Sequence, residues 1–372
     1  MQDTQALPIE LRRRWWGVAA VFGATFLATH FLLLVLTTPT APTFWGLPSG
    51  ILLMYLLGYA RINLQHNRRG AETPILSHLG ISNGLTLTRG LLYGLLAGFI
   101  AHPPSSGWWT VVPGVLYTSA ALTDIADGYL ARVRGETTRL GAKLDIEVDS
   151  LGILVATILA VQLGRIPDIF LVFAGLYYLF RMGLWWRAKR GLPVYEMPQS
   201  PWRRLIGGFQ VGFLCVILWP VLPNTVTTLG GYVLAGPILL SFLRDWYVVS
   251  RGSNRTLKAI ETSLQSMASI VPVLLRALLA GAGAIFLFEL TEAPLLMTVA
   301  GVAGLFSVLV GGAGRLGALV WLAIGCAQAT AVGLTELSSV VIASSLGVML
   351  LGVGAFAVWT PSDRLLKQRL GD

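Results

Sequence analysis

Charged residues, cysteine and histidine are all scarce in this sequence. Of its 372 residues only 12% are charged, against roughly 25% in ordinary soluble domains, while 55% are hydrophobic. Together with a mean hydropathy of +0.70, this composition excludes a soluble globular domain and predicts an all-α, polytopic membrane protein. The two cysteines, Cys215 and Cys326, both lie in apolar runs, so the sequence implies no disulfide framework.

Acidic residues are the scarcer charged class, with 18 Asp and Glu against 27 Lys and Arg, and the net charge is +9. A basic balance can indicate nucleic-acid binding, but basic residues in a membrane protein usually mark cytoplasmic loops and contacts with anionic headgroups. We therefore expect a lipid bilayer as the partner, and no nucleic acid. The triplet Arg12–Arg14 precedes an apolar run that is too long for a signal peptide, so we expect a retained membrane helix there.

Twelve apolar segments are candidates for membrane spans, since a span needs about 20 predominantly apolar residues. Loops rich in Arg and Lys alternate with loops that hold few or no basic residues. The positive-inside rule then places the N-terminus and the basic loops in the cytoplasm of a plasma or inner membrane. The segments cover 15–37, 43–60, 85–101, 109–131, 144–163, 168–186, 205–222, 227–243, 272–290, 293–313, 316–332 and 338–359.

Three sections follow from this arrangement. Residues 1–65 form an N-terminal transmembrane hairpin, 66–258 hold six spans, and 259–372 form C-terminal transmembrane helices whose role the sequence does not reveal. The last section is rich in glycine, which lets membrane helices pack closely. Residues 74–80 are either an interfacial helix or a plain connector.

Four aspartates in the middle section carry the chemistry. Asp124 and Asp127 are three residues apart, and Asp145 and Asp149 are four apart, so each pair lies on one face of a helix. A carboxylate at the centre of a membrane helix costs about 2.5–3.5 kcal/mol, which calls for a compensating cation. The basic loop 133–143 joins the two pairs and places them at the cytoplasmic surface.

These ligands suit a particular class of metal and reaction. Ligands that are all oxygen favour Mg²⁺ or Mn²⁺, and the lack of nearby histidine or cysteine argues against zinc. A two-metal carboxylate site stabilises the attacking and leaving oxygens of a phosphate ester. Small residues on the stripe of Asp124 leave room for a bulky ligand, namely Gly128 and Ala131.

The spacing D-x₂-D-G-x₂-A-R-x₈-G-x₃-D-x₃-D resembles the motif of the CDP-alcohol phosphotransferase (CDP-alcohol phosphatidyltransferase) family. The segment 82–89 also resembles the start of that family's first core helix, and the resemblance covers about 82–250, the usual six-helix core. All eight fixed positions match: Asp124, Asp127, Gly128, Ala131, Arg132, Gly141, Asp145 and Asp149.

The resemblance implies a reaction and a set of roles. A CDP-linked donor such as CDP-diacylglycerol would give its phosphatidyl group to a small hydroxyl acceptor, with release of CMP, in phospholipid biosynthesis. The four aspartates would bind two Mg²⁺ or Mn²⁺ ions, and Asp149 would also take the proton of the acceptor hydroxyl as the catalytic base. Family members are usually homodimers. The donor pocket would be lined by Gly128, Ala131, Arg132 and Gly141, with Asn83 and Arg89 contacting the nucleotide or helix ends.

Several assignments stay open at this level. A membrane transporter with an intramembrane carboxylate ion site is the alternative function, although the charges cluster at one membrane face and no inverted repeat is evident. Glu147 lies opposite the aspartates and is expected to meet a neighbouring helix or a partner subunit. Lys143 either contacts a substrate phosphate or reaches the membrane surface. The acceptor is not identified, and a basic set could bind its phosphate or attract anionic lipid: Arg181, Arg187, Lys189, Arg190, Arg203 and Arg204.

Overall fold

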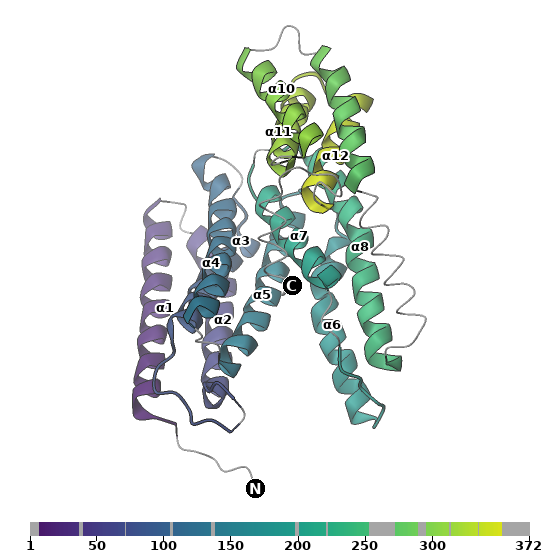
Figure 1. Cartoon of the computed structure of the whole chain (residues 1–372). Helices are drawn as coiled ribbons and strands as arrows, with labels where there is room; N and C mark the ends of the chain where they lie inside the picture. The colour runs from purple at the N-terminus through teal and green to yellow at the C-terminus, as the bar shows by residue number, and fades with distance from the viewer. Residues whose placement is uncertain are drawn as a thin grey trace. The chain divides into compact units, whose positions relative to one another are not determined.

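The predicted all-α, polytopic membrane fold is confirmed by the computed structural model (Figure 1). In the part of the chain that the structure describes there are helices and connecting turns but no strand. Within a bilayer this is expected, because a helix satisfies every backbone hydrogen bond internally. The described residues are 7–36, 40–70, 72–104, 107–134, 138–197, 201–220, 222–252, 272–288, 295–311, 314–333 and 335–351.

Each of the twelve predicted segments overlaps a helix of the described residues, and the part 352–359 of the last segment lies outside them. A further helix covers Pro272–Phe288 and has no label in Figure 1. The structure also has two short 3₁₀ helices, η1 (Leu64–His66) and η2 (Gly107–Val111). The labelled α-helices are α1 (Ile9–Leu36), α2 (Thr40–Asn63), α3 (Ile81–Ala101), α4 (Val112–Arg134), α5 (Arg139–Gln162), α6 (Phe170–Lys189), α7 (Pro201–Ile217), α8 (Asn224–Arg251), α10 (Leu295–Val310), α11 (Gly314–Val332) and α12 (Glu336–Leu351).

Four of these helices are long and apolar enough to cross a membrane by themselves: α1, α2 with η1, α3 and α8. Helices α4 and α5 have sufficient length, but they hold the charged residues of the aspartate motif. Helix α8 continues to Arg251, beyond the predicted end at residue 243, because hydropathy marks where a helix leaves the apolar layer and not where its hydrogen bonding stops.

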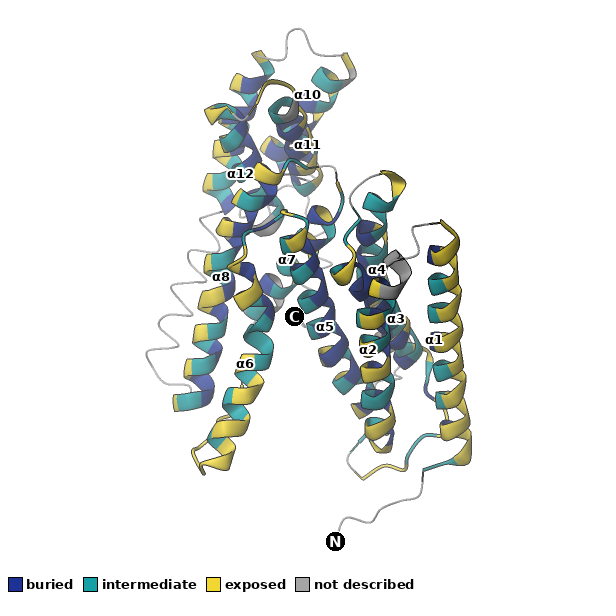
Figure 2. Cartoon of the chain, turned by 180° about the vertical axis from the view of Figure 1, so that it is seen from behind, coloured by how far each residue is buried: buried dark blue, intermediate teal, exposed yellow. Residues whose placement is uncertain are grey.

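The chain divides into two compact units, Met1–Arg181 with Gln210–Val221, and Met182–Phe209 with Leu222–Asp372. The division into the sections 1–65, 66–258 and 259–372 stays a prediction. In the first unit α3 is the central helix, with extensive contacts to α2, α4 and α5, whereas α1 packs mainly on α2. Most of the surface of α1 is exposed (Figure 2), as expected for a helix that faces lipid.

A glycine stripe on α3 receives large side chains from α2. Gly90, Gly94 and Gly98 are spaced by four residues and therefore lie on one helix face. A Cβ atom at these positions would meet Leu56, Leu53 and Trp45 respectively. Glycines at this spacing allow two membrane helices to approach closely, so α2 is packed tightly against α3.

The segment 74–80 is a connector and not an interfacial helix. The buried side chain of Asn67 donates hydrogen bonds to the carbonyl oxygens of Leu76 (3.2 Å) and His78 (2.8 Å). The carbonyl of Asn67 in turn accepts from the N–H of Leu76 at 2.8 Å. Gly80, with φ of 77°, then turns the chain into α3, a conformation that favours glycine.

The second unit contains the closely packed C-terminal helices. Helix α11 contacts both α10 and α12. At the α10–α11 contact, a Cβ atom on Gly304 would lie 3.2 Å from the carbonyl oxygen of Gly317, so the two backbones nearly touch. This agrees with the expected role of small residues in this section. A buried cluster around Phe286 and Trp321 forms the centre of these helices.

Candidate functional site

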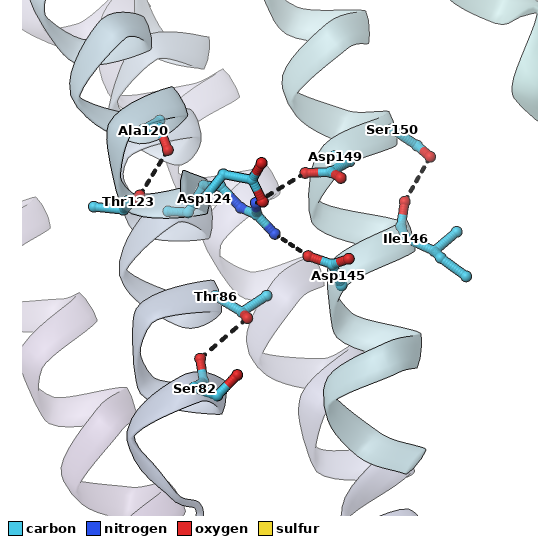
Figure 3. A network of polar contacts seen from close by, with 10 residues as sticks. Ser82, Thr86, Ala120, Thr123, Asp124, Asp145, Ile146, Asp149 and Ser150 are labelled. Atoms are coloured by element: carbon cyan, nitrogen blue, oxygen red, sulfur yellow. Dashed lines mark hydrogen bonds and ion pairs between the residues drawn. The ribbon is translucent and has the colours of Figure 1, made fainter. Parts of the chain in front are cut away.

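Three of the four motif aspartates converge on one point between α4 and α5 (Figure 3). Asp124 comes from α4, and Asp145 and Asp149 come from α5; one carboxylate oxygen of each lies within 4.8 Å of the other two. Their side chains are 51%, 48% and 43% exposed, respectively. The cluster is therefore close enough to share a cation and open enough to admit a ligand.

Arg89 of α3 contacts all three carboxylates. Its guanidinium forms ion pairs with Asp124 and Asp145, and its Nη1 lies 3.2 Å from Oδ1 of Asp149. The arginine side chain is only 1% exposed. A buried guanidinium needs ionic partners to offset the loss of hydration, and the aspartates supply them. From the sequence alone we expect Arg89 at the nucleotide or at a helix end, and its pairing with the aspartates was not predicted. The usable signal was a lone cation in an apolar helix of a chain with an acidic motif.

The donor set fits a divalent cation. Three aspartates and one arginine carry a formal charge of −3 + 1 = −2 when all are ionised, which one divalent ion would neutralise. The ligands are all oxygen, as Mg²⁺ and Mn²⁺ prefer. Because the carboxylates come from two helices that α3 holds together, the site depends on tertiary packing and not on a local loop.

Part of the aspartate motif on α4 lies outside the residues whose side chains the structure describes. The helix runs through the whole stretch up to Arg134. The side chains of four predicted site residues, however, lie outside the described residues, and their roles stay predictions: Asp127, Gly128, Ala131 and Arg132.

Asn83 and Gly141 lie together where α3 and α5 begin. Thr138 is the N-cap of α5, and its Oγ1 accepts a hydrogen bond from the N–H of Gly141 at 3.0 Å. The buried Asn83 amide donates to Oγ1 of Thr138 (3.2 Å) and to the carbonyl of Leu79 (2.6 Å). A Cβ atom on Gly141 would lie 2.6 Å from Oδ1 of Asn83, so only glycine fits without a shift. These contacts fix the start of α5, the helix that carries Asp145 and Asp149. A contact of Asn83 or Gly141 with the nucleotide stays a prediction.

The opposite face of α5 is bound to α2 and α6. Glu147 is 1% exposed and accepts hydrogen bonds from Oη of Tyr55 (2.8 Å) and Nη1 of Arg181 (2.7 Å). This confirms the expectation that Glu147 meets neighbouring helices. One turn earlier, Nζ of Lys143 lies 3.2 Å from Oδ1 of Asn63 and 3.1 Å from Nε2 of His66. Helix α5 therefore presents aspartates on one face and is anchored through Lys143 and Glu147 on the other.

Most of the basic residues that could bind an acceptor phosphate have protein partners in the structure. Nη2 of Arg187 donates to the carbonyls of Pro193 (2.9 Å) and Ser250 (3.0 Å). Nη1 of Arg203 lies 3.7 Å from Oδ2 of Asp245. The cations of Lys189 and Arg190 lie over tryptophan rings, Trp185 and Trp186. The side chain of Arg204 lies outside the described residues.

Comparison with known proteins gives one match. Residues 79–243 match the family model of CDP-alcohol phosphatidyltransferase. The comparisons with curated proteins and with solved structures found no match. The matched range is slightly less than half of the 372 residues, and it contains Arg89 and the whole aspartate motif. The resemblance drawn from the motif spacing is thus confirmed over residues 79–243, which match the CDP-alcohol phosphatidyltransferase family model.

Proposed function

We propose that the chain transfers a phosphatidyl or similar phosphoalcohol group from a CDP-linked donor, such as CDP-diacylglycerol, to a hydroxyl acceptor and releases CMP. The family supports transferase activity, with a CDP-alcohol as donor and an alcohol as acceptor. The observation that carries the proposal is the cluster of Asp124, Asp145 and Asp149, whose oxygens lie within 4.8 Å of one another around the buried Arg89. A diphosphate suits such a cluster, because a bound divalent cation stabilises the attacking and leaving oxygens of a phosphate ester.

In this proposal the four motif aspartates bind Mg²⁺ or Mn²⁺, which when present neutralises charge on the diphosphate. The acceptor oxygen forms a bond to the phosphorus that carries the alcohol group. The bond from that phosphorus to the bridging oxygen breaks, and CMP leaves with this oxygen. Asp149, which is 43% exposed, accepts the hydroxyl proton as general base. Arg89 holds the carboxylates in place from the buried side.

The cellular setting of the proposal rests on the loops. Basic residues flank the motif, as in Arg132, Arg134, Arg139 and Lys143, and this supports a cytoplasmic active site at a plasma or inner membrane. There the enzyme would draw its donor sideways from the bilayer and serve phospholipid biosynthesis. A homodimer, as is usual in the family, is part of the proposal.

The test is release of CMP from CDP-diacylglycerol by protein purified in detergent with Mg²⁺ or Mn²⁺, across a panel of polyol, polyol phosphate and inositol phosphate acceptors. We expect acceptor-dependent release that is lost in Asp149→Asn. Asp168→Asn is the matched control, because Asp168 lies in the connection between α5 and α6, outside the cluster, and its replacement should leave the rate unchanged.

The outcomes distinguish a phosphotransferase from an ion transporter. Release that persists in Asp149→Asn would contradict the role of the proposed base. Absence of turnover together with absence of metal-dependent nucleotide binding would overturn the proposal and favour an ion-transport function for the carboxylates.

A further inference from the structure

A groove separates α1 from α3 on the side of α3 that faces away from the aspartates. Helix α1 packs mainly on α2. The space left between α1 and α3 has a volume of about 720 Å³. It is lined by one face of α1 between Arg14 and Phe22, by the connector 78–81, and by Gly84, Leu87, Thr88 and Leu91 of α3. This volume is within the range of about 300–1,000 Å³ that is usual for ligand sites.

The groove is basic at one end and apolar along its length. Arg14 and His78 are exposed at one end, and Arg14 is the last residue of a run of three arginines. Beyond them the walls are apolar, with Val18 and Val21 on α1 and Leu91 on α3. From Arg14 to Val21 a helix rises about 10 Å, which is less than the roughly 15 Å of hydrocarbon in one leaflet.

The groove is separate from the carboxylate cluster. By helical periodicity, Gly84, Thr88 and Leu91 share one face of α3, and Arg89 points about 130° away from the centre of that face. Arg89 contacts the aspartates. A molecule in the groove would therefore not occupy the position of the reacting donor.

The surroundings identify the occupant. Helix α1 is long and apolar enough to span the bilayer and is exposed over most of its surface, so acyl chains are what surround the groove. Arginine at the cytoplasmic boundary attracts anionic headgroups. We propose that the groove binds one anionic glycerophospholipid of the cytoplasmic leaflet, with its phosphate at Arg14 and His78 and an acyl chain between α1 and α3. This lipid fills the gap between the N-terminal hairpin and the catalytic segment.

Two glycines of α1 provide a matched pair of variants. A Cβ atom on Gly17 or on Gly23 would meet no atom within 4 Å, so a larger side chain at either position starts in open space. Gly17 lines the groove and Gly23 does not. Gly17→Leu therefore fills the groove, while Gly23→Leu makes the same chemical change on the same helix outside it. For the charge, Arg14→Gln is paired with Arg12→Gln, since Arg12 does not line the groove.

The experiment is native mass spectrometry of the full chain, purified in mild detergent and re-equilibrated with nanodiscs of phosphatidylglycerol or phosphatidylcholine. We expect one retained phosphatidylglycerol per chain, a loss of fivefold or more in Gly17→Leu, and wild-type retention in Gly23→Leu. Arg14→Gln should reduce the preference for the anionic lipid about fivefold, since a basic residue near a membrane surface contributes about that factor, and Arg12→Gln should not.

Equal retention in Gly17→Leu and Gly23→Leu would overturn the proposal, as would equal retention of the two lipids by the wild type. A third result would also overturn it: if Gly17→Leu lowers the mass of the oligomer in size-exclusion chromatography with light scattering, the groove holds a helix of a second copy and not a lipid. CMP release measured on the same samples is a separate readout, so a failure of the proposed reaction leaves the lipid test intact.

Discussion

Arg89 supplies a buried positive charge to three carboxylates, and its replacement by leucine tests how the site is built. The substitution changes the formal charge of Asp124, Asp145, Asp149 and residue 89 together from −2 to −3. We expect two effects of opposite sign. The metal-free protein loses stability, because the carboxylates repel one another without a cation. The affinity for Mg²⁺ or Mn²⁺ rises, because the metal no longer shares the site with the guanidinium.

The magnitudes follow from the geometry. At 3.2 Å, the Arg89–Asp149 distance, two unit charges interact with about 1 kcal/mol in water and about 5 kcal/mol at an effective dielectric constant of 20. Because the aspartates are nearly half exposed, the lower part of this range applies, and we expect a loss of roughly 2 kcal/mol. Removing one positive charge about 4 Å from a divalent ion in water-like surroundings relieves about 2 kcal/mol, which predicts metal binding on the order of 30-fold tighter.

The assay is thermal unfolding in detergent with and without Mn²⁺, combined with a titration of free Mn²⁺ by electron paramagnetic resonance. The melting temperature of Arg89→Leu should fall in chelator and recover with saturating metal, since a ligand that binds only the folded state stabilises it. Arg251→Leu, an exposed arginine at the end of α8, is the control for loss of an arginine alone. Equal destabilisation with and without metal, or an unchanged Mn²⁺ midpoint, would refute the reasoning.

Three further changes test other parts of the structure. Gly94→Ala places a Cβ atom against a leucine of α2 and should destabilise the protein by about 1–3 kcal/mol in denaturant titration, whereas Gly58→Ala, with open space, should not; equal effects would contradict the close packing. Glu147→Gln weakens the buried contact with Arg181 and should lower the melting temperature by a few degrees with less than a tenfold loss of CMP release, so a loss as large as that of Asp149→Asn would assign Glu147 to the chemistry instead. Treatment with EDTA should abolish CMP release, Mg²⁺ or Mn²⁺ should restore it and Zn²⁺ should not; restoration by Zn²⁺ alone would contradict the oxygen-ligand site.

The positions of the helices could be predicted from the sequence, because an apolar run of about 20 residues leaves the backbone no other way to satisfy its hydrogen bonds in a bilayer. The candidate metal site could be predicted for a similar reason. The spacing of Asp145 and Asp149 fixes a shared helix face, and their cost in an apolar layer demands a cation. The family match of residues 79–243 could be predicted from the same spacing. Helix ends were predicted less well, since the polar start of α5 at Thr138 carries no hydropathy signal.

The partners of these residues were decided only by the tertiary structure. Arg89 reaches aspartates 35 to 60 residues away in the chain, and Glu147 meets Tyr55 from the N-terminal hairpin. Such pairs depend on which helices are neighbours and at what rotation, and a periodic pattern specifies a helix's faces but not the helix that each face meets. The glycines Gly90, Gly94 and Gly98 mark a face for close approach, yet only packing assigns that face to α2. The groove beside α1 arises in the same way, from the contact that α1 makes with α2 and the space it leaves beside α3.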